Sequence, residues 1–325
     1  MSKRILLIDG DQIAYICAAA AEERFIRVTH QPTGIIKTFK SRRAFKKAME
    51  DRKKVVTEDY SIEDVQEAES TSFCLKVIKQ KIANLVRDTK ADEYYIYCQE
   101  EDNFRLKLPL PNIQYKGNRT SSIRPVLLPE AKEYLQRVHK SIKSYGHETD
   151  DSLIIRAYEE IAKGNEPVLA NFDKDAYQAE GIRIYNFKQE NPEVFLVLEL
   201  GELQFINPNT VKGSGIKFLC VQWLYGDSTD GFCPYDLTSA RFGAKAVYNL
   251  LKDLDTPKAC LEAVIKKYKE WYPEPFEYKA WNGEVIKADW KFLLDMYFKC
   301  CWMKRRMDDP SDPKELFNKY GVEYN

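Results

Sequence analysis

Three short apolar segments of this chain are each followed directly by acidic residues. The segments, with the acids that follow them, are Ile5–Ile8 with Asp9 and Asp11, Tyr94–Cys98 with Glu100, and Val168–Ala170 with Asp173 and Asp175. Short apolar runs are typical of strands buried on both faces of a sheet, and helix-like patterns separate them. The alternation predicts an α/β fold with a mostly parallel sheet flanked by helices. Because the carboxyl ends of parallel strands meet at one edge, the acids should gather there.

The stretches between the buried strands predict the remaining elements. Helices are expected at residues 12–21, 41–54, 61–88, 129–145 and 151–163, a hairpin at 26–39, and further strands at 182–187 and 195–200. The prolines in residues 101–125 predict an irregular basic loop there. After Gly213 the chain is expected to be mostly helical. We therefore expect a core over residues 1–218, with a basic region at about 105–146, and a helical region over residues 219–325.

The composition excludes several classes of protein. Hydrophobic residues make up 44% of the 325, enough for a sizeable core, and no stretch is long and apolar enough to cross a bilayer. The first apolar run ends after four residues at Asp9, which is too short for a secretory signal. Eight cysteines without a Cys-x-x-Cys pair and only three histidines argue against a zinc site and are typical of the reducing cytoplasm.

The charges are unevenly placed, although fifty basic and fifty acidic residues give zero formal net charge. Residues 37–54 hold nine Lys or Arg and two acids, and residues 105–145 hold nine Lys or Arg and two Glu. Such runs create strong local fields within a neutral chain, and basic ones attract phosphates. Taken alone, each run is more simply the solvated face of a helix.

Two further acidic clusters follow the second buried strand in the sequence. They are Glu148-Thr149-Asp150-Asp151 and Gly226-Asp227-Ser228-Thr229-Asp230-Gly231. Closely packed carboxylates repel one another unless a cation neutralises them, and Mg²⁺ prefers such oxygen ligands. Two Mg²⁺ ions about 4 Å apart can activate water on one side of a phosphodiester and stabilise the leaving oxygen on the other. The acids therefore predict a two-magnesium hydrolytic site, in which Mn²⁺ can substitute.

Each acidic motif also has a plain structural explanation. Asp-Gly pairs are common in turns, Asp150 could cap the helix that it begins, and residues 226–231 are turn formers. For any single motif this explanation is the simpler one. It does not require acids at the end of every buried strand, so the metal site is favoured when the motifs are taken together.

Basic and aromatic residues alternate in the loop after the second buried strand. They are Phe104-Arg105 and Tyr115-Lys116-Gly117-Asn118-Arg119. A phosphodiester needs cations near the scissile phosphate, and a tyrosine beside them can stack on a base without reading sequence. Gly117 would let the backbone approach closely. Beside an acidic pocket, we interpret the loop as a phosphate-binding segment.

Five motifs of the chain, taken in order and approximate spacing, resemble those of the bacteriophage 5′→3′ exonucleases. The motifs are ILLIDGD, FR followed by YKGNR, ETDDSLI, NFDKD and GDSTDG. These enzymes belong to the flap-endonuclease group, whose fold is PIN-like, and the likeness is to those of short-tailed phages in particular. It covers roughly residues 4–16 and 94–255. It implies that residues 1–218 are a PIN-like nuclease core, in which residues 120–146 take the place of a helical arch.

The resemblance implies metal ligands at the matching positions. For the first Mg²⁺ ion they are Asp9, Glu148, Asp150 and Asp173, with Glu100 acting through water where the family has an aspartate. For the second ion they are Asp175, Asp227 and Asp230, and Asp151 could serve either ion. Glu100 departs from the family pattern, and Glu101 or Asp102 could take its role.

The resemblance also implies residues that act on the substrate. Lys116 and Arg119 would contact the scissile phosphate and form the catalytic set with Asp150 and Asp173, and Tyr115 would stack on the terminal nucleotide. The implied nucleic-acid-binding residues are Arg105, Tyr115, Lys116, Arg119, Arg124, Gly243 and Lys245. Residues 241–246 resemble a helix–turn–helix that grips duplex DNA and can hold K⁺. One glycine of that turn is missing here, which argues against K⁺, and an ordinary helix start explains the segment equally well.

The expected function is that of a cytoplasmic 5′→3′ exonuclease with flap-endonuclease activity on DNA. Phage DNA replication or breakdown of host DNA would be its setting. A ribonuclease of the same fold, acting on an RNA–DNA hybrid, would use the same residues.

Two further classes of protein fit the sequence less well. A haloacid-dehalogenase phosphatase resembles the chain only at residues 9–11 and 226–230, and it leaves residues 115–119 unexplained. A non-catalytic nucleic-acid-binding protein does not need the acids, which weaken phosphate binding. Residues 26–75 match no motif, and their basic hairpin and helix could widen a DNA surface or bind a partner.

Overall fold

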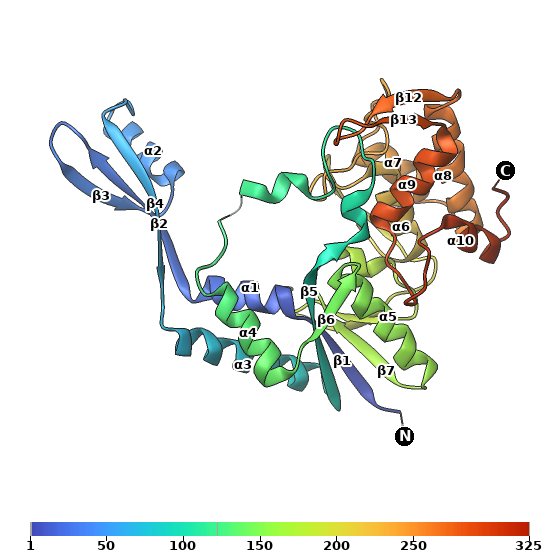
Figure 1. Ribbon diagram of the computed structural model, residues 1–325, viewed down its shortest axis with the longest axis horizontal. Coiled ribbons are helices and arrows are strands. Elements are labelled where there is room, and N and C mark those ends of the chain that lie inside the picture. Colours follow the sequence, from blue (N-terminus) through green and yellow to red (C-terminus); the bar gives the residue numbers. More distant parts are fainter. Residues whose placement is uncertain (1, 122, 325) are drawn as a thin grey trace. The chain divides into compact units, whose positions relative to one another are not determined.

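The computed structural model describes residues 2–121 and 123–324, and the chain forms two compact units (Figure 1). The first unit comprises Met1–Asp9, Asn84–Ser122 and Ser141–Asn325, and the second comprises Gly10–Ala83 and Ile123–Lys140. The units do not divide at the boundary predicted near residue 218. Helix α6 (Gly215–Tyr225) crosses that boundary, and because all but its last residue are buried, it belongs to the core of the first unit.

The first unit contains a six-stranded sheet, whose strands lie in the order β6-β5-β1-β7-β8-β9. Its strands are β1 (Arg4–Asp9), β5 (Glu93–Asn103), β6 (Ile142–Gly146), β7 (Glu166–Ala170), β8 (Arg183–Tyr185) and β9 (Val194–Leu196). Neighbouring strands run parallel except for β9, which is antiparallel to β8. The α/β fold with a mostly parallel sheet flanked by helices is thus confirmed.

Helix α5 (Thr149–Ala162) packs across β1 and β7. Its apolar face buries Leu153, Ile154 and Ala157 against side chains of the two strands. The helical spacing of the sequence predicts this face together with Ile161, which is instead exposed near the end of the helix. The helix begins just after β6, so its N-terminus lies where the central strands end.

The C-terminal part of the first unit is mostly helical, as predicted. Its helices are α6, α7 (Ala244–Leu251), α8 (Pro257–Trp271), α9 (Trp290–Cys301) and α10 (Pro313–Lys319). Trp223 lies at the centre of their core, with its ring centroid 4.7 Å from that of Phe298 and 5.7 Å from that of Phe317. Two short hairpins that the sequence did not predict, β10–β11 (Leu203–Asn207, Thr210–Gly213) and β12–β13 (Phe276–Lys279, Val285–Ala288), complete the region.

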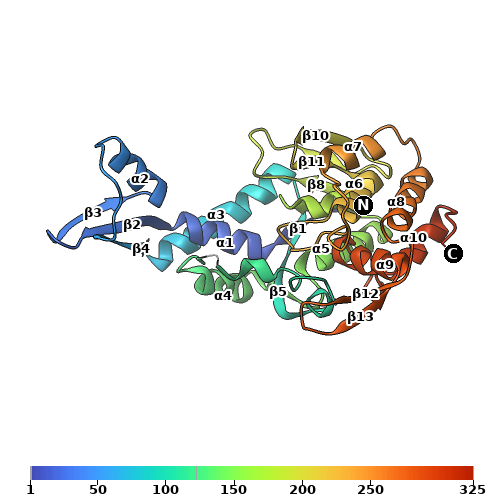
Figure 2. The same cartoon turned by 90° about the horizontal axis from the view of Figure 1, so that it is seen from above.

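The second unit combines a helical part with a small antiparallel sheet (Figure 2). Its helices are α1 (Gly10–Ala20), α2 (Arg42–Glu50), α4 (Leu128–His139) and most of α3 (Thr71–Thr89). The sheet has the order β3-β2-β4, with β2 (Glu22–His30), β3 (Ile35–Phe39) and β4 (Tyr60–Ala68). We call residues 22–68, which contain this sheet and α2, the inserted module.

Two helices predicted from the sequence are wrong over part of their length. Residues 60–68 form β4 and not the start of a helix, because all nine pair with β2 and this pairing outweighs their local preference. The helix predicted to reach residue 145 ends at His139. Lys140 adopts a left-handed conformation (φ 53°) that stops it, and the next residues pair with β5 as β6.

No helix within the described residues combines the length and the apolar character that spanning a membrane requires.

Candidate active site

Seven carboxylates form an acidic cluster at the carboxyl edge of the sheet. They are Asp9 at the end of β1, Glu148 and Asp150 at the start of α5, Asp173 and Asp175 after β7, and Asp227 and Asp230 in the loop after α6. Asp9, Asp173 and Asp175 are among them, as expected from the strand ends, whereas Asp11 lies in α1 with Lys132 Nζ 2.5 Å from its Oδ1. Electrostatic interactions connect the seven carboxylates through Asp150, Asp175 and Asp230. The segments that contribute them are up to about 220 residues apart in the chain, so the fold, and not local sequence, creates the cluster.

Asp150 experiences the strongest repulsion in the cluster. Burial raises its pKa well above the usual range, and the negative charges of Asp173, Asp9 and Glu148 raise it further. One of its oxygens accepts a hydrogen bond from Asn171 Nδ2 at 2.9 Å. The start of α5 favours the ionised form of an acid. That effect is too small to offset the neighbouring carboxylates.

The pKa values of Asp175 and Asp230 are also raised. Burial raises the pKa of Asp175 well above the usual range, with Asp173 as the next contributor. The pKa of Asp230 is raised mainly by burial, although Lys116 acts in the opposite direction. Burial therefore opposes ionisation of these acids, and neighbouring carboxylates add to its effect.

Three partly exposed cationic side chains are paired with the cluster, in addition to the buried Arg105, whose Nη1 lies 3.6 Å from Glu148 Oε2. Lys116 binds Glu148, Arg119 binds Asp230, and Lys174 Nζ lies 2.7 Å from Asp227 Oδ2. Burial alone would raise the pKa of Asp227, but Lys174 lowers it below its usual value. Burial alone would lower the pKa of Lys116, but Glu148 raises it, so this lysine carries a positive charge at neutral pH.

The charge of the site suits divalent cations. The seven carboxylates outnumber the cationic side chains that the described contacts pair with them. Carboxylate oxygens are also the ligands that Mg²⁺ prefers. Over the described residues, no three Asp, Glu, His or Cys side chains are gathered closely enough to hold a metal ion as they stand. Lysine and arginine groups lie against several of the carboxylates instead.

Lys116 is held in place by its backbone as well as by its charge. It has a left-handed conformation (φ 59°), and its N–H donates to the Asp230 carbonyl at 2.7 Å. A non-glycine residue in this region costs of order 1 kcal/mol or more and is common at functional sites. The left-handed backbone conformation in this loop therefore lies at Lys116, the residue before Gly117.

A cavity of about 780 Å³ adjoins the cluster at Asp227. Lys174 and Asp227 line one part of it, and Phe172, Tyr177 and Tyr225 contribute aromatic surface. The cavity gives a substrate room beside the acids.

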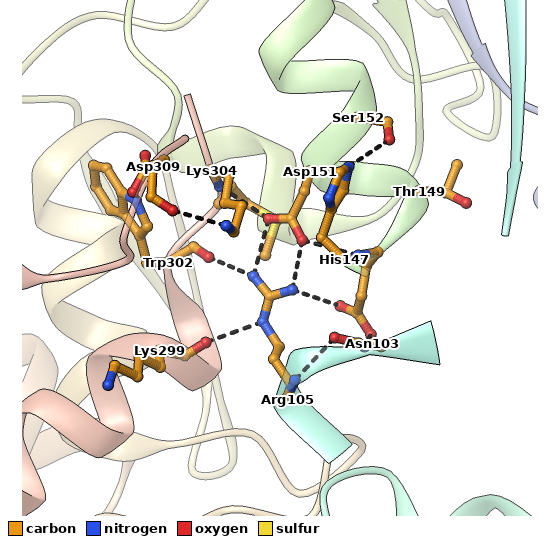
Figure 3. A network of polar contacts seen from close by, with 12 residues as sticks. Asn103, Arg105, His147, Thr149, Asp151, Ser152, Lys299, Trp302, Lys304 and Asp309 are labelled. Carbon is orange, nitrogen blue, oxygen red and sulfur yellow. Dashed lines mark hydrogen bonds and ion pairs between the residues drawn. The ribbon is translucent and has the colours of Figure 1, made fainter. Parts of the chain in front are cut away.

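Arg105 and Asp151 form a buried ion pair, which corrects two predicted roles (Figure 3). Arg105 Nη1 lies 2.6 Å from Asp151 Oδ2, its Nη2 donates to Asp151 Oδ1 at 3.0 Å, and the arginine is 0% exposed. Asp151 also accepts from the backbone N–H groups of Glu148 and Lys304. Arg105 therefore cannot contact nucleic acid, and Asp151 has its oxygens occupied by protein donors and not by a metal ion.

Tyr115 is also buried, at 1% exposure, and cannot stack on a nucleotide as predicted. Its hydroxyl donates to Asp230 at 2.7 Å and lies 3.4 Å from Glu148. The buried hydroxyl of Tyr115 thus helps to position the carboxylates of Asp230 and Glu148. Burial, followed by the negative charge of Glu148, raises its pKa well above the usual range, so it remains a donor.

Glu100 lies within β5 and not after it, because that strand continues to Asn103. Its carboxylate is 3.0 Å from Lys143 Nζ, on the neighbouring strand β6. No interaction connects it with the acidic cluster among the described contacts, so the structure does not support Glu100 as a ligand. The side chains of Glu101 and Asp102 lie outside the described part of the chain.

The structure places the remaining predicted residues at other positions. Gly243 caps the start of α7 and Lys245 is exposed in its first turn, which agrees with a helix start and does not distinguish the two readings of that segment. Arg124 belongs to the second unit, where its carbonyl accepts a hydrogen bond from Gln66 at 3.0 Å.

Several residues that support the acids were missed in the sequence. Asn103 donates to Glu148 at 2.9 Å, Asn171 to Asp150 and Gln222 to Asp175, and Lys174 neutralises Asp227. Lys174 could have been found, because it stands between two acids of the same motif. The amides carry no comparable signal, since a single Asn or Gln is equally at home in a turn.

Comparisons with known proteins give structural likeness only. The chain matches no protein-family model and no curated protein. Among solved structures, a bacteriophage T5 protein co-crystallised with metal ions shares 13% identity over 93% of this chain and 89% of its own, with a TM-score of 0.47. T5 5′-exonuclease with bound zinc shares 13% over 92% and 88% (TM-score 0.46). T5 flap endonuclease in a pseudo-enzyme–product complex with DNA and metal ions shares 11% over 83% and 86% (TM-score 0.45). Because these TM-scores lie below 0.5, the acidic cluster itself has to carry any functional conclusion.

Proposed function

We propose that this protein is a divalent-metal-dependent nuclease. The observation that carries the proposal is the gathering of seven buried or partly buried carboxylates in one cluster, beside Lys116 and Arg119, which are suited to phosphate. A polyanionic substrate could not approach such a cluster without added positive charge. Divalent cations supply that charge.

Within this class, we propose a 5′→3′ exonuclease with flap-endonuclease activity on DNA. The order of the five acidic and basic motifs along the sequence supports the choice. We place its work in phage DNA replication or the breakdown of host DNA, in the cytoplasm of the host cell.

Two groups of carboxylates would hold the cations, which we propose to be Mg²⁺, with Mn²⁺ able to substitute. The first group is Asp9, Glu148, Asp150 and Asp173, and the second is Asp175, Asp227 and Asp230. When bound, the ions lower the pKa of water and stabilise charge on the leaving oxygen. Asn171, Tyr115 and Gln222 orient carboxylates of the two groups through their hydrogen bonds.

Lys116 and Arg119 would bind the scissile phosphate. Both are partly accessible, with side-chain exposures of 24% and 49%, and both lie against carboxylates of the cluster. Asp150 and Asp173 complete the catalytic set. The phosphate would therefore be held between the basic loop and the acids.

The test is a cleavage assay with Mg²⁺ or Mn²⁺ on end-labelled duplex, 5′-flap and single-stranded DNA and on an RNA–DNA hybrid. We expect 5′-end or flap products from DNA, and none in excess EDTA. Undiminished cleavage in EDTA would refute the metal-dependent class. Preferential cleavage of the hybrid would favour a ribonuclease of the same fold, since that enzyme would use the same residues. Trapping of a phosphorylated aspartate would instead indicate a phosphatase.

A further inference from the structure

The inserted module carries a positive surface that the proposed active site does not use. Of the nine cations in residues 37–54, Arg42 is bound by Asp64, with Nη2 to Oδ2 at 2.7 Å. The other eight are exposed and form no ion pair with any residue that the structure describes. They are Lys37, Lys40, Arg43, Lys46, Lys47, Arg52, Lys53 and Lys54.

Helix α2 separates its cations from its apolar residues. Phe45 and Met49 are buried in the module's own core, at 3% and 7% exposure. At 100° per residue, Lys47 lies opposite these two residues and Arg43 lies near Lys47, while Lys46 lies at the border of the apolar face. Like charges one turn apart, such as Arg43 and Lys47, cost the helix about 0.2–0.5 kcal/mol. Glu50 and Asp51 follow one turn after Lys46 and Lys47, and these opposite charges offset that cost.

An aromatic cavity of about 240 Å³ lies on the apolar side of α2, where Phe45 and Met49 line it. Four rings line it and contact one another in series, with centroid distances of 4.8 Å for His30–Tyr60, 5.5 Å for Phe45–Tyr60 and 5.1 Å for Phe39–Phe45. The cations Lys37, Arg52 and Lys54 also line it. Aromatic surface surrounded by cations is the combination that binds unpaired bases together with their phosphates.

We propose that the inserted module binds single-stranded nucleic acid, with one base in the aromatic cavity and the adjacent phosphates on the cations of residues 37–54. A duplex keeps its bases stacked and paired, so it can use the cations but not the cavity. An anionic membrane offers charge without a base. This binding site is separate from the acidic cluster and goes beyond the proposed nuclease function.

The first test reverses the charge of the three cations that line the cavity, in the full chain. The variant Lys37→Glu/Arg52→Glu/Lys54→Glu is compared with wild type for binding of a short, labelled single-stranded oligonucleotide in EDTA, where no cleavage occurs. We expect the affinity to fall about tenfold or more. The plot of log binding constant against log salt concentration should become shallower, by the amount that corresponds to the loss of about two phosphate contacts. The matched control is Lys279→Glu/Lys287→Glu/Lys314→Glu, which makes the same change in net charge at exposed lysines of the first unit.

The second test addresses the cavity. His30→Ala removes one partly exposed ring at the end of β2, and Tyr60→Leu keeps apolar volume while removing the stacking surface. Each should weaken single-strand binding several-fold without altering the salt slope, because no cation is lost. Photo-crosslinking with a bromouracil-substituted oligonucleotide should place the adduct on residues 30, 39 or 60.

Three results would overturn the proposal. They are a triple variant that binds like its matched control, crosslinks confined to the first unit, or binding of anionic phospholipid vesicles by residues 37–54 with no loss of oligonucleotide affinity in the variant. Equal competition by duplex DNA for the crosslinked site would refute the base-in-cavity arrangement. Cleavage in Mg²⁺ is recorded separately, so a failure here leaves the nuclease proposal standing, and the converse also holds.

Discussion

Asp150 and Asp227 differ in the charge that surrounds them, although both belong to the same cluster. Asp227 has Lys174 as a direct partner, and its pKa is lowered despite burial. Asp150 has only an amide donor and four neighbouring acids, and its pKa is raised by burial and by their charge. The free energy cost of the cluster is therefore concentrated at particular residues, and single substitutions can reveal it.

Asp150→Asn removes one charge from the repelling group while keeping the side-chain shape. We expect cleavage to fall by about 100-fold or more, because a metal ligand worth several kcal/mol of transition-state stabilisation is lost. In EDTA the same variant should melt at a higher temperature than wild type, because repulsion is relieved. Thermal melting with and without Mg²⁺ checks both effects, since Mg²⁺ should stabilise wild type more than the variant. A variant that is less stable than wild type in EDTA would contradict the account of the cluster.

Lys116→Met tests the proposed phosphate contact. The substitution keeps most of the side-chain volume and removes the charge that pairs with Glu148. Single-turnover cleavage should slow by about 100-fold, while the affinity for DNA in EDTA falls only a few-fold, since one cation among many is lost. A change in affinity alone would exclude the proposed role. The matched comparison is Lys174→Met, which likewise removes one cation paired with an acid of the cluster, in this case Asp227.

At the scale of elements, the Arg105–Asp151 pair joins three segments of the first unit. Arg105 follows β5, Asp151 lies in α5, and the arginine also donates to the carbonyls of Lys299 and Trp302 at the end of α9, at 3.0 and 2.5 Å (Figure 3). Glu148 forms a longer ion pair with the same arginine, with its Oε2 3.6 Å from Arg105 Nη1. The pair thus fixes the start of α5, where two of the cluster's acids are located.

Arg105→Met should destabilise the protein by about 3–5 kcal/mol, because it leaves Asp151 buried without a counter-charge. Asp151→Leu should cost a similar amount. The double variant should cost clearly less than the sum, and denaturant unfolding of all four proteins measures this coupling. Arg306→Met, which breaks an exposed pair with Glu315, is the control and should cost less than about 1 kcal/mol. Additive effects would show that the two residues do not act as a pair.

The success of sequence-based prediction also differs from element to element. The acids at strand ends could be predicted, because a parallel sheet brings the ends of distant strands together whatever lies between them. The burial of Arg105 and Tyr115 could not, because a basic, aromatic segment has the same composition whether it faces solvent or supports a site. The strands β4 and β6 were missed for a related reason, since only their partners β2 and β5 make them strands.

At the scale of the whole molecule, the C-terminal residues are tied back to the sheet-bearing core of the first unit. Glu180, just before β8, binds Arg305 and accepts from Lys319 Nζ at 3.0 Å. Burial would raise the pKa of Glu180, but Arg305 and then Lys319 lower it below its usual value. The charge of one partly buried residue thus connects the C-terminal segment with the sheet of the first unit.

This ion pair predicts how stability depends on pH. A carboxyl whose pKa is lower in the folded state stabilises the protein fully above its unfolded pKa, and this contribution is lost as the pH falls through the folded pKa. The free energy of unfolding of wild type should therefore exceed that of Glu180→Gln at neutral pH, and the difference should shrink below the usual carboxyl pKa of about 4.3. Denaturant titrations at several pH values measure it. A difference that grows on acidification would have the wrong sign.

The inserted module begins and ends at the same place, because Glu22 pairs with Ala68 across β2 and β4. A segment whose two ends are neighbours can be added to a chain, or removed from it, without changing the distance that the flanking helices must span. Its own core of Ile26, Val28, Phe45 and Met49 lies wholly within it. The inserted module can therefore change by mutation independently of the acids in the first unit. The proposed binding of nucleic acid by the module and the proposed cleavage by the acidic cluster could then evolve at separate rates.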